Sequence, residues 1–506
     1  MNMIFCSGSL LALILGLYAA GANADAAPGT SALWGQAGER WTDQSRLPDF
    51  SFAGYRCGET PIPQIAVTTS VMDFGAKGDG VADDTQAFIK AVNETPKGAI
   101  FIPQGRYVLT QVVKITKSNL VLRGAGPDKT ILVIPKSLSD IAGPQFNDGK
   151  SRYSFTGGFI TVAGSMKGEK LADVAEPAKR GDRQLVLSAP LDIAPGTFIR
   201  LTMTDADHTL GRYLHADQED AGVDTYKGLA GKNWIDWAAR VAAVTGNRVT
   251  LDRPLRLDVR PEWKPEIRAY DPAVAEVGIE DLAFEFPGVA KQPHLKEEGF
   301  NSIHITNAAN CWVRNVVFTD ADNGVIVGGS RFCTVANTRF RAAKRKGMTG
   351  HHALWATGGS QDCLFTGFAF DTTYVHDLTV EGRANGNVFR DGSGVSLNFD
   401  HHRNVPYENL FTNLDVGNPR RVWQSSGRGD RGPHTGARAT FWNLRGKGTF
   451  PKPPNWPQIN VIGVGGYARA TTDDKSWIEP ASDGIQPPDL YEAQLKRRLE
   501  KAAPLK

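Results

Sequence analysis

The sequence predicts an all-β protein whose chain coils into a parallel β-helix. Two observations favour this fold class over a helical bundle. Glycine and proline are frequent, with 54 glycines and 29 prolines among 506 residues, as expected for a chain with many turns. A short unit of one Cys or Asn followed by hydrophobic residues also recurs through the C-terminal half. The hydrophobic share of 41% is that of a globular protein, so disorder of the whole chain is excluded.

The first residues indicate export. An apolar run from Leu10 to Ala20 precedes Ala22-Asn23-Ala24, a small-residue pattern typical of signal-peptide cleavage. The run is too short to span a membrane. We therefore expect a signal peptide over residues 1–24, no membrane span, and a secreted or periplasmic protein.

Two stretches are expected before the regular coils. Residues 25–66 are rich in Trp, Gly and Pro without clear periodicity, which predicts an extended N-terminal segment lying on the main body. Residues 67–164 predict the N-terminal cap and the first coils of the β-helix. Here Asp83, Asp84 and Thr85 supply N-cap chemistry for a short helix. The buried face of that helix and the strands after it are expected at Ala87, Phe88, Ala91, Val92, Ala99–Ile102, Tyr107–Leu109 and Leu120–Leu122.

Residues 165–260 interrupt the coil pattern and predict an inserted β module. Hairpin signals occur at Pro195-Gly196 and Gly246-Asn247, with a long polar and aromatic loop between them. The acidic residues of that loop could hold calcium, but a solvated acidic loop is the favoured interpretation. Calcium is therefore possible and not predicted, and no cofactor is assigned. The acidic residues are Asp217, Glu219, Asp220 and Asp224.

We expect the regular coils over residues 261–470, and a C-terminal tail with a capping helix over residues 471–506. The recurring Cys or Asn positions are separated by 22, 30, 24 and 22 residues, the length of one β-helix coil with occasional loops. We expect these positions to form one internal ladder in which cysteine is a packing residue rather than a redox or zinc-binding one. The ladder consists of Cys311, Cys333, Cys363, Asn387 and Asn409.

The stretch Val71–Gly126 resembles a known family. Its segments DFGAKGDGVADDTQAF and FIPQGRYVL are similar to the N-terminal signature of the pectate-lyase-like superfamily. That resemblance implies a right-handed parallel β-helix with short capping helices, and carbohydrate chemistry. The superfamily includes polygalacturonases, polysaccharide lyases, epimerases and phage tail-spike depolymerases. The signature covers about a tenth of the chain and is specific for fold rather than reaction.

The chain departs from two well-known members of this superfamily. It lacks the polygalacturonase pattern of Asn-Thr-Asp, Asp-Asp, Gly-His-Gly and Arg-Ile-Lys, and no calcium-binding carboxylate set of a pectate lyase is recognisable. Neither pectin nor polygalacturonate is therefore assumed as the substrate.

Histidines mark the candidate site, because six of the ten lie between His351 and His434. Counting back eleven positions from each ladder residue gives the column Phe300, Asp322, His352, His376 and Asn398. Adjacent coils stack about 4.8 Å apart, so a column in register becomes a row in space. We expect titratable groups to gather on one wall, with Asp400, His401 and His402 just beyond the row and His434 further along.

The surroundings of this row are basic. Residues 300–450 contain seventeen Lys and Arg against eleven Asp and Glu, which favours an anionic polysaccharide or oligosaccharide as partner. The whole chain has a net charge of only +3, which does not indicate a nucleic-acid binder. Arginine suits bidentate contact with carboxylates. The predicted substrate-binding residues are Asp322, Asn398, Arg403, Arg428, Arg431 and His434.

Two enzyme classes compete. β-Elimination on a uronate-containing polysaccharide requires a neutralised carboxylate, a base for the C5 proton and an acid for the leaving oxygen, roles that suit Arg, His and Tyr. We expect His376 as base and Tyr374 as acid. The predicted catalytic set is His352, His376, Tyr374, Asp400, His401 and His402, without a metal.

Two alternatives to elimination stay open at this point. A glycoside hydrolase would use two carboxylates, which Asp320, Asp322 and Asp400 could supply. A β-helix that binds a glycan without cleaving it would need neither a base nor an acid, and aromatic and arginine side chains would suffice.

Overall fold

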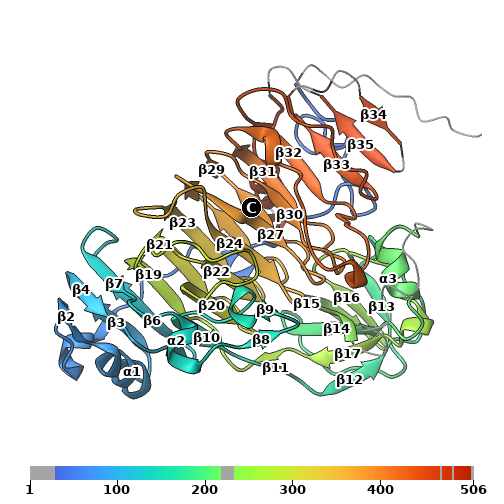
Figure 1. Ribbon diagram of the computed structural model, residues 1–506. Helices are drawn as coiled ribbons and strands as arrows, with labels where there is room; N and C mark the ends of the chain where they lie inside the picture. The colour runs from blue at the N-terminus through green and yellow to red at the C-terminus, as the bar shows by residue number, and fades with distance from the viewer. Residues whose placement is uncertain are drawn as a thin grey trace, which may run out of the picture.

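The computed structural model describes residues 29–217, 233–465, 467, 470–473, 475–480 and 484–502. The predicted signal peptide and the acidic residues Glu219, Asp220 and Asp224 lie outside these residues. The described chain forms an all-β parallel β-helix that runs diagonally through Figure 1, which confirms the predicted fold class. No described helix is long and apolar enough to cross a lipid bilayer.

Two long ladders of strands line the coils. Among the described residues, the larger one (sheet 1) has 18 strands. They are β1 (Val67–Ser70), β2 (Asp79–Asp83), β3 (Gly98–Ile102), β4 (Gly105–Val108), β6 (Leu120–Gly124), β7 (Thr130–Val133), β19 (Gly278–Glu285), β21 (Trp312–Thr319), β23 (Thr334–Arg341), β25 (Leu364–Thr366), β26 (Ala369–Phe370), β28 (Val388–Arg390), β29 (Ser393–Gly394), β31 (Leu410–Asp415), β32 (Thr440–Arg445), β33 (Ile459–Ile462), β34 (Thr471–Thr472) and β35 (Ser476–Glu479).

The second ladder (sheet 2) has seven strands within the described ranges and is parallel throughout. They are β5 (Val113–Ile115), β10 (Ile160–Ala163), β20 (Asn301–Thr306), β22 (Asn323–Gly328), β24 (Met348–Thr357), β27 (Thr373–Val380) and β30 (Phe399–His401). Isolated parallel bridges form a third, narrow ladder between the two sheets, through Ala275, Ala309, Arg331, Gln361, Asn385, Tyr407 and Ala437.

The predicted Cys and Asn ladder follows directly after this third ladder. The amide N–H of Cys363 donates to Asn387 Oδ1 at 3.0 Å, and the amide N–H of Asn387 donates to Asn409 Oδ1 at 3.1 Å. The cysteines Cys311, Cys333 and Cys363 are buried and carry free thiols. The two asparagines of this ladder thereby accept hydrogen bonds from the backbone of the preceding coil, as buried polar groups require.

A second column, made of Asn, Asp and one Gly, bends the long strands of sheet 1. Asn315, Asn337, Asn413 and Asn443 have φ between 52° and 54°, and Asp281, Gly367 and Asp391 stand at the same place in their coils with φ between 49° and 66°. Asn, Asp and Gly tolerate this left-handed conformation better than other residues. These residues lie inside the long strands, as Asn315 does in β21 and Asn337 in β23.

Stacked aromatic rings fill the interior of the coils. Phe365, Phe389, Phe411 and Phe441 stack with centroids 4.4, 4.9 and 5.1 Å apart. These spacings match the distance between neighbouring strands. At the N-terminal end, α1 (Thr85–Glu94) buries Ala87, Phe88, Ala91 and Val92 against the same core, as the sequence predicts.

The inserted module is an antiparallel sheet with its own core (lower right in Figure 1). It extends beyond the predicted boundary at residue 260, because β17 pairs with both β12 and β14. A buried ion-pair network connects it to the coils through Glu408, which contacts Arg180, Arg256 and Arg438. The strands of the module are β12 (Lys170–Asp173), β13 (Gln184–Val186), β14 (Phe198–Thr204), β15 (Asn233–Thr245), β16 (Arg248–Leu251) and β17 (Glu266–Ala269).

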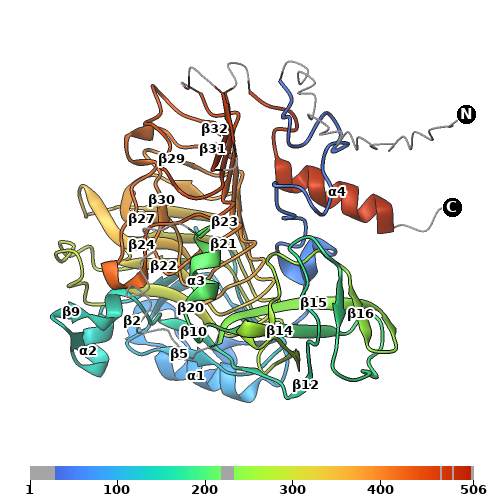
Figure 2. The same cartoon turned by 90° about the vertical axis from the view of Figure 1, so that its right-hand side faces the viewer.

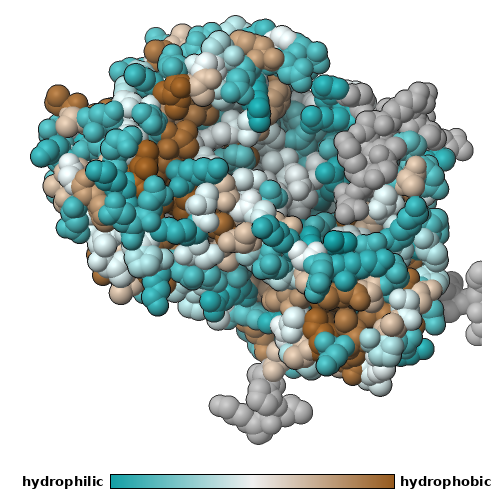
Figure 3. Space-filling view, turned by 90° about the horizontal axis from the view of Figure 1, so that it is seen from below, coloured by the Kyte–Doolittle hydropathy of each residue, from teal (hydrophilic) through white to brown (hydrophobic). Residues whose placement is uncertain are grey.

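The C-terminal helix α4 (Leu490–Ala502) lies along the side of the coils rather than closing their end (Figure 2). Its residues Leu490 and Tyr491 pack with Phe50 of the N-terminal segment and with Leu410 and Trp442 of sheet 1. The expectation of an end cap was wrong because the outer face of these coils is itself apolar and needs a cover. The face seen from below is mostly hydrophilic and carries two hydrophobic patches (Figure 3).

Short elements complete the described chain. The hairpin of β8 and β9 matters most, because it borders the site described next. These elements are α2 (Leu138–Ala142), α3 (Thr209–Leu214), β8 (Phe146–Asn147), β9 (Lys150–Ser151), β11 (Met166–Lys167), β18 (Asp271–Pro272) and the 3-10 turns Tyr55–Gly58, Val71–Phe74, Arg152–Ser154, Pro261–Trp263, Pro419–Arg421 and Gly429–Arg431.

Candidate active site

Strands β24, β27 and β30 of sheet 2 bring the predicted histidines together. His352 and His376 are direct register partners, with ring centroids 4.5 Å apart. The predicted row is wrong by one residue at both ends. The His352 amide donates to Asn323 rather than standing level with Asp322, and Asn398 exchanges hydrogen bonds with Asp377 rather than His376.

Asp400 holds two imidazoles at once. Its Oδ2 lies 2.6 Å from Nδ1 of His402 and 3.0 Å from Nδ1 of His376, and its Oδ1 accepts the amide N–H of Ser426 at 2.9 Å. Burial would raise the pKa of Asp400, but the two imidazoles outweigh it and hold this pKa well below its usual range. Conversely, burial would lower the pKa of His402, but Asp400 raises it. The carboxylate thereby orients His402 through a hydrogen bond to Nδ1 and contacts Nδ1 of His376 as an ion pair, which leaves Nε2 of both rings for other partners.

Two further imidazoles lie behind this pair. His351 and His352 are fully buried, with ring centroids 4.2 Å apart, and His352 stacks on Trp355 at 4.0 Å. Burial, together with the charges of neighbouring imidazoles, lowers the pKa of both well below the usual value. Both rings are therefore neutral near pH 7.

The sequence analysis missed His294, which completes the cluster. It lies between β19 and β20, and its Nε2 is 3.1 Å from Nε2 of His351. No spacing rule assigns a residue of this connection to the wall, so only the fold reveals it.

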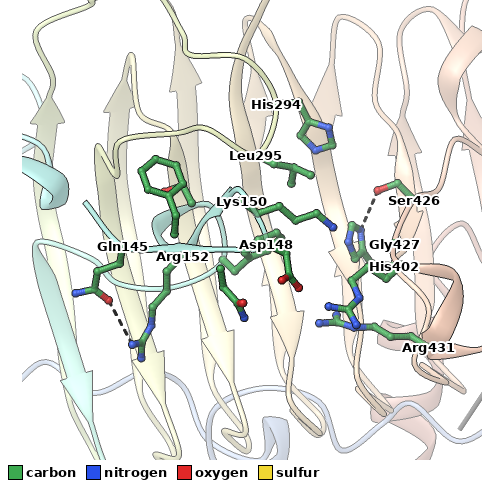
Figure 4. A pocket seen from close by; sticks show the side chains of 15 residues that line it. Gln145, Asp148, Lys150, Arg152, His294, Leu295, His402, Ser426, Gly427 and Arg431 are labelled. Atoms are coloured by element: carbon green, nitrogen blue, oxygen red, sulfur yellow. Dashed lines mark hydrogen bonds between the residues drawn. The ribbon is translucent and has the colours of Figure 1, made fainter. Parts of the chain in front are cut away.

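A cavity of about 760 Å³ opens in front of the cluster (Figure 4). The β8–β9 hairpin forms one side, and the loop that follows Ser426 forms another. Charged groups on the lining are mainly cationic, with Lys150, Arg152, Arg428 and Arg431 against the single carboxylate of Asp148. The lining also includes Gln145, Phe146, Asn147, Ser151, Phe155, His294, Leu295, His402, Ser426 and Gly427.

Two predicted catalytic residues face the interior instead of this cavity. Tyr374 is fully buried, packs edge-on against Phe340 and Phe370, and has a hydroxyl without a hydrogen-bond partner. His401 packs against Trp456 with centroids 4.2 Å apart. The prediction that these two lie on the wall was wrong, because both side chains point into the apolar core of the coils.

Three predicted polar residues stabilise the backbone. Asp322 accepts the amide N–H groups of Gly299 and Phe300 and pairs with Arg345 at 2.8 Å. Asn398 accepts the amide N–H of Asp377 through Oδ1 and donates from Nδ2 to the carbonyl of Gln424. Asp320, offered as a hydrolase carboxylate, accepts three backbone N–H groups from residues 343–345. All three are buried and their oxygens are occupied by partners.

The predicted arginines divide between structure and cavity. Arg403 donates to the carbonyls of Gly427 and Gly432 and so shapes the loop at the cavity. Arg431 lines the cavity while pairing with Glu381, and Arg428 lines it as well. His434 donates from Nδ1 to the carbonyl of His401, 3.1 Å away, and is not part of the lining.

Residues 68–151 match the family model described as "Rhamnogalacturonase A/epimerase, pectate lyase-like". The match covers about a sixth of the chain and shows a similarity to pectate-lyase-like proteins over this N-terminal part, while the parallel β-helix fold rests on the strand ladders described above. The matched range ends before the histidine wall and includes only the hairpin side of the cavity, so it says nothing of the reaction.

Similar proteins match mainly over short stretches. The preneck appendage protein of Bacillus phage PZA is 33% identical over 94 residues, 19% of this chain and 10% of that protein. Alginate lyase 7 of Azotobacter vinelandii is 39% identical over 72 residues, 12% of this chain and 8% of that protein. Among solved structures, the tailspike protein gp49 from Pseudomonas phage LKA1 has a TM-score of 0.47 and 14% identity, covering 78% of this chain and 67% of the tailspike.

Proposed function

We propose that this protein is a secreted or periplasmic enzyme that cleaves an acidic, uronate-containing polysaccharide by β-elimination. The observation that carries the proposal is the Asp400–His402 pair, which borders a cavity with a cationic lining. Alginate lyase 7, whose short matching segment is described above, gives the same reaction class some support.

His402, rather than His376, is the base in this proposal. His402 lines the cavity, whereas His376 does not. Because Nδ1 of His402 is held by Asp400, Nε2 is the nitrogen that takes the C5 proton of the substrate. The nearby carboxylate stabilises the imidazolium that forms, as in other carboxylate-oriented histidine bases.

The second proton transfer uses the same imidazole. No tyrosine is among the described residues that line the cavity, so Tyr374 is replaced as the acid. As the C4–O bond breaks and the C4–C5 double bond forms, the imidazolium of His402 returns its proton to the leaving oxygen. One residue can serve both steps when the proton and the leaving group are on the same face of the sugar.

The cavity supplies the charge that elimination needs. Lys150, Arg152 and Arg428 can neutralise the C5 carboxylate, which acidifies the neighbouring C–H bond. Phe146 at the rim is 58% exposed and offers a face on which a sugar ring can stack. Hydrolysis is less well supported, because the described lining holds one carboxylate, Asp148, where two are required.

Incubation of the protein with a panel of uronans tests the proposal. We expect an unsaturated, ultraviolet-absorbing product from at least one polymer. New reducing ends without this absorbance would show hydrolysis instead. Binding without turnover on every polymer would favour the non-catalytic glycan-binding alternative.

A further inference from the structure

Three histidines at the inner side of the cavity have the arrangement of a metal site. His294, His351 and His376 each offer a ring nitrogen, and these nitrogens lie within 4.8 Å of one another. We propose that this triplet binds one divalent transition-metal ion of the zinc class, with a fourth coordination position open to the cavity. The site goes beyond the proposed elimination chemistry and can be tested without any substrate.

The ring geometry supports a single shared ion. Nε2 of His294 and Nε2 of His351 are 3.1 Å apart, and the three ring centroids are separated by 4.9, 5.3 and 5.7 Å. The rings are inclined to one another by 55° to 69°. In a tetrahedral site with Zn–N bonds of about 2.0–2.1 Å, imidazole centroids lie roughly 5 Å apart. The site therefore requires little rearrangement to accept the ion.

In two of the three imidazoles, Nδ1 (the nitrogen that would not bind the metal) already has a partner. Nδ1 of His351 lies 2.9 Å from the carbonyl oxygen of Ser154, and Nδ1 of His376 lies 3.0 Å from Asp400. Such partners fix the ring orientation and leave Nε2 as the ligand.

Buried carboxylates lie beside two of the proposed ligands, and one of them, Glu297, is also paired with Lys291. Glu297 is fully buried, with Oε2 3.8 Å from Nδ1 of His351, and Asp400 contacts His376 from the other side. His294 is exposed on the cavity lining. The open position of the ion therefore faces the space in which a substrate carboxylate would lie, where a Lewis acid can polarise it.

The neighbouring triplet is a weaker candidate. The nitrogens of His352, His376 and His402 also lie within 4.8 Å of one another. However, the rings of His352 and His376 stack at an angle of only 26°. An imidazole binds a metal in the plane of its ring, so stacked rings are poorly placed to share one ion.

Metal binding by the purified full chain tests this assignment. The protein is stripped with a chelator and titrated with Zn²⁺ by calorimetry and with Co²⁺ by visible absorption, in the absence of polysaccharide. We expect one ion per chain and the absorption bands of a tetrahedral cobalt site. Substitution of the accessible ligand, H294Q, should weaken binding at least about 100-fold, and D400N, which removes an outer partner, should weaken it about 10- to 100-fold.

Two control variants make the result decisive. H304Q changes a histidine that belongs to neither triplet, and H402Q changes one that belongs only to the neighbouring triplet. Both should keep one ion per chain. Full-affinity binding by H294Q, loss of binding in H402Q, or no stoichiometric binding by the unmodified chain would overturn the proposal. Because no substrate is present, these outcomes are independent of whether the protein is a lyase.

Discussion

At the scale of single residues, His402 carries the proposed chemistry. We expect His402→Gln to lower turnover by about a hundredfold to ten-thousandfold, the usual effect of removing a proton-transfer group. The side chain is only 8% exposed but borders the cavity, so the fold should tolerate an amide in its place. Initial rates of ultraviolet absorbance on the preferred uronan measure the effect, and circular dichroism checks the fold. A folded variant with near-normal turnover would assign the base elsewhere.

Lys150 illustrates a different kind of residue, one that attracts the substrate without moving protons. We expect Lys150→Ala to raise KM about tenfold while kcat changes little, because a charge-assisted contact to a carboxylate is lost. The effect should shrink in high salt, since salt screens exposed charges. Lys496→Ala, on the exposed face of α4, is the matched control. An unchanged KM in the Lys150 variant would place the substrate outside the hairpin side of the cavity.

The sequence located His352 and His376 on adjacent coils because a 24-residue step in the ladder carries them into register. It could not locate His294, Lys150 or Arg152, because these lie on connections that the fold brings to the wall from distant parts of the chain. Tyr374 and His401 do lie on the expected strands, but their side chains point into the core instead of toward the cavity. A column of coil positions says which residues are level with one another but not which side chain points inward.

At the scale of elements, the column of left-handed residues in sheet 1 gives a prediction about stability. Asn337 is exposed in β23 with φ of 54°, so its side chain contributes little burial while its backbone demands an unusual conformation. We expect Asn337→Val to lower the free energy of unfolding by about 1–2 kcal/mol, the cost of this conformation for such a residue. Asn337→Gly should be nearly neutral. Urea unfolding measures both, and equal effects of Val and Gly would contradict the role of the bend.

At the scale of the whole molecule, the network around Glu408 joins the inserted module to the coils. Burial would raise the pKa of Glu408, but Arg180, Arg438 and Arg256 outweigh it and lower this pKa to about 2. A lowered carboxyl pKa contributes stability above the unfolded-state value of about 4.5, and this contribution is lost as the pH falls toward 2. The module and the coils should therefore loosen together in acid.

Glu408→Gln tests this connection. Because it removes the carboxylate shared by Arg180, Arg256 and Arg438, of which Arg256 keeps a second partner in Asp362, we expect a loss of about 3–5 kcal/mol at pH 7. The unmodified chain should lose stability between about pH 4.5 and 2 as Glu408 is protonated, and the variant should not show this part of the loss. Thermal unfolding across this range measures both effects, with the exposed Glu500→Gln as control. Parallel pH profiles for the Glu408 variant and the unmodified chain would refute the assignment.

The unequal spacing of the ladder has a consequence for how such a protein can change over generations. The core of each coil is complete in about 22 residues, and the longer steps place their extra residues in connections outside the ladder. One such connection, after β31, carries Ser426, Arg428 and Arg431 to the cavity. Insertions and deletions beyond Trp423, which packs on Phe441, leave the stack of phenylalanines in place. New glycan preferences can therefore arise by loop length alone, while the solenoid retains its stability.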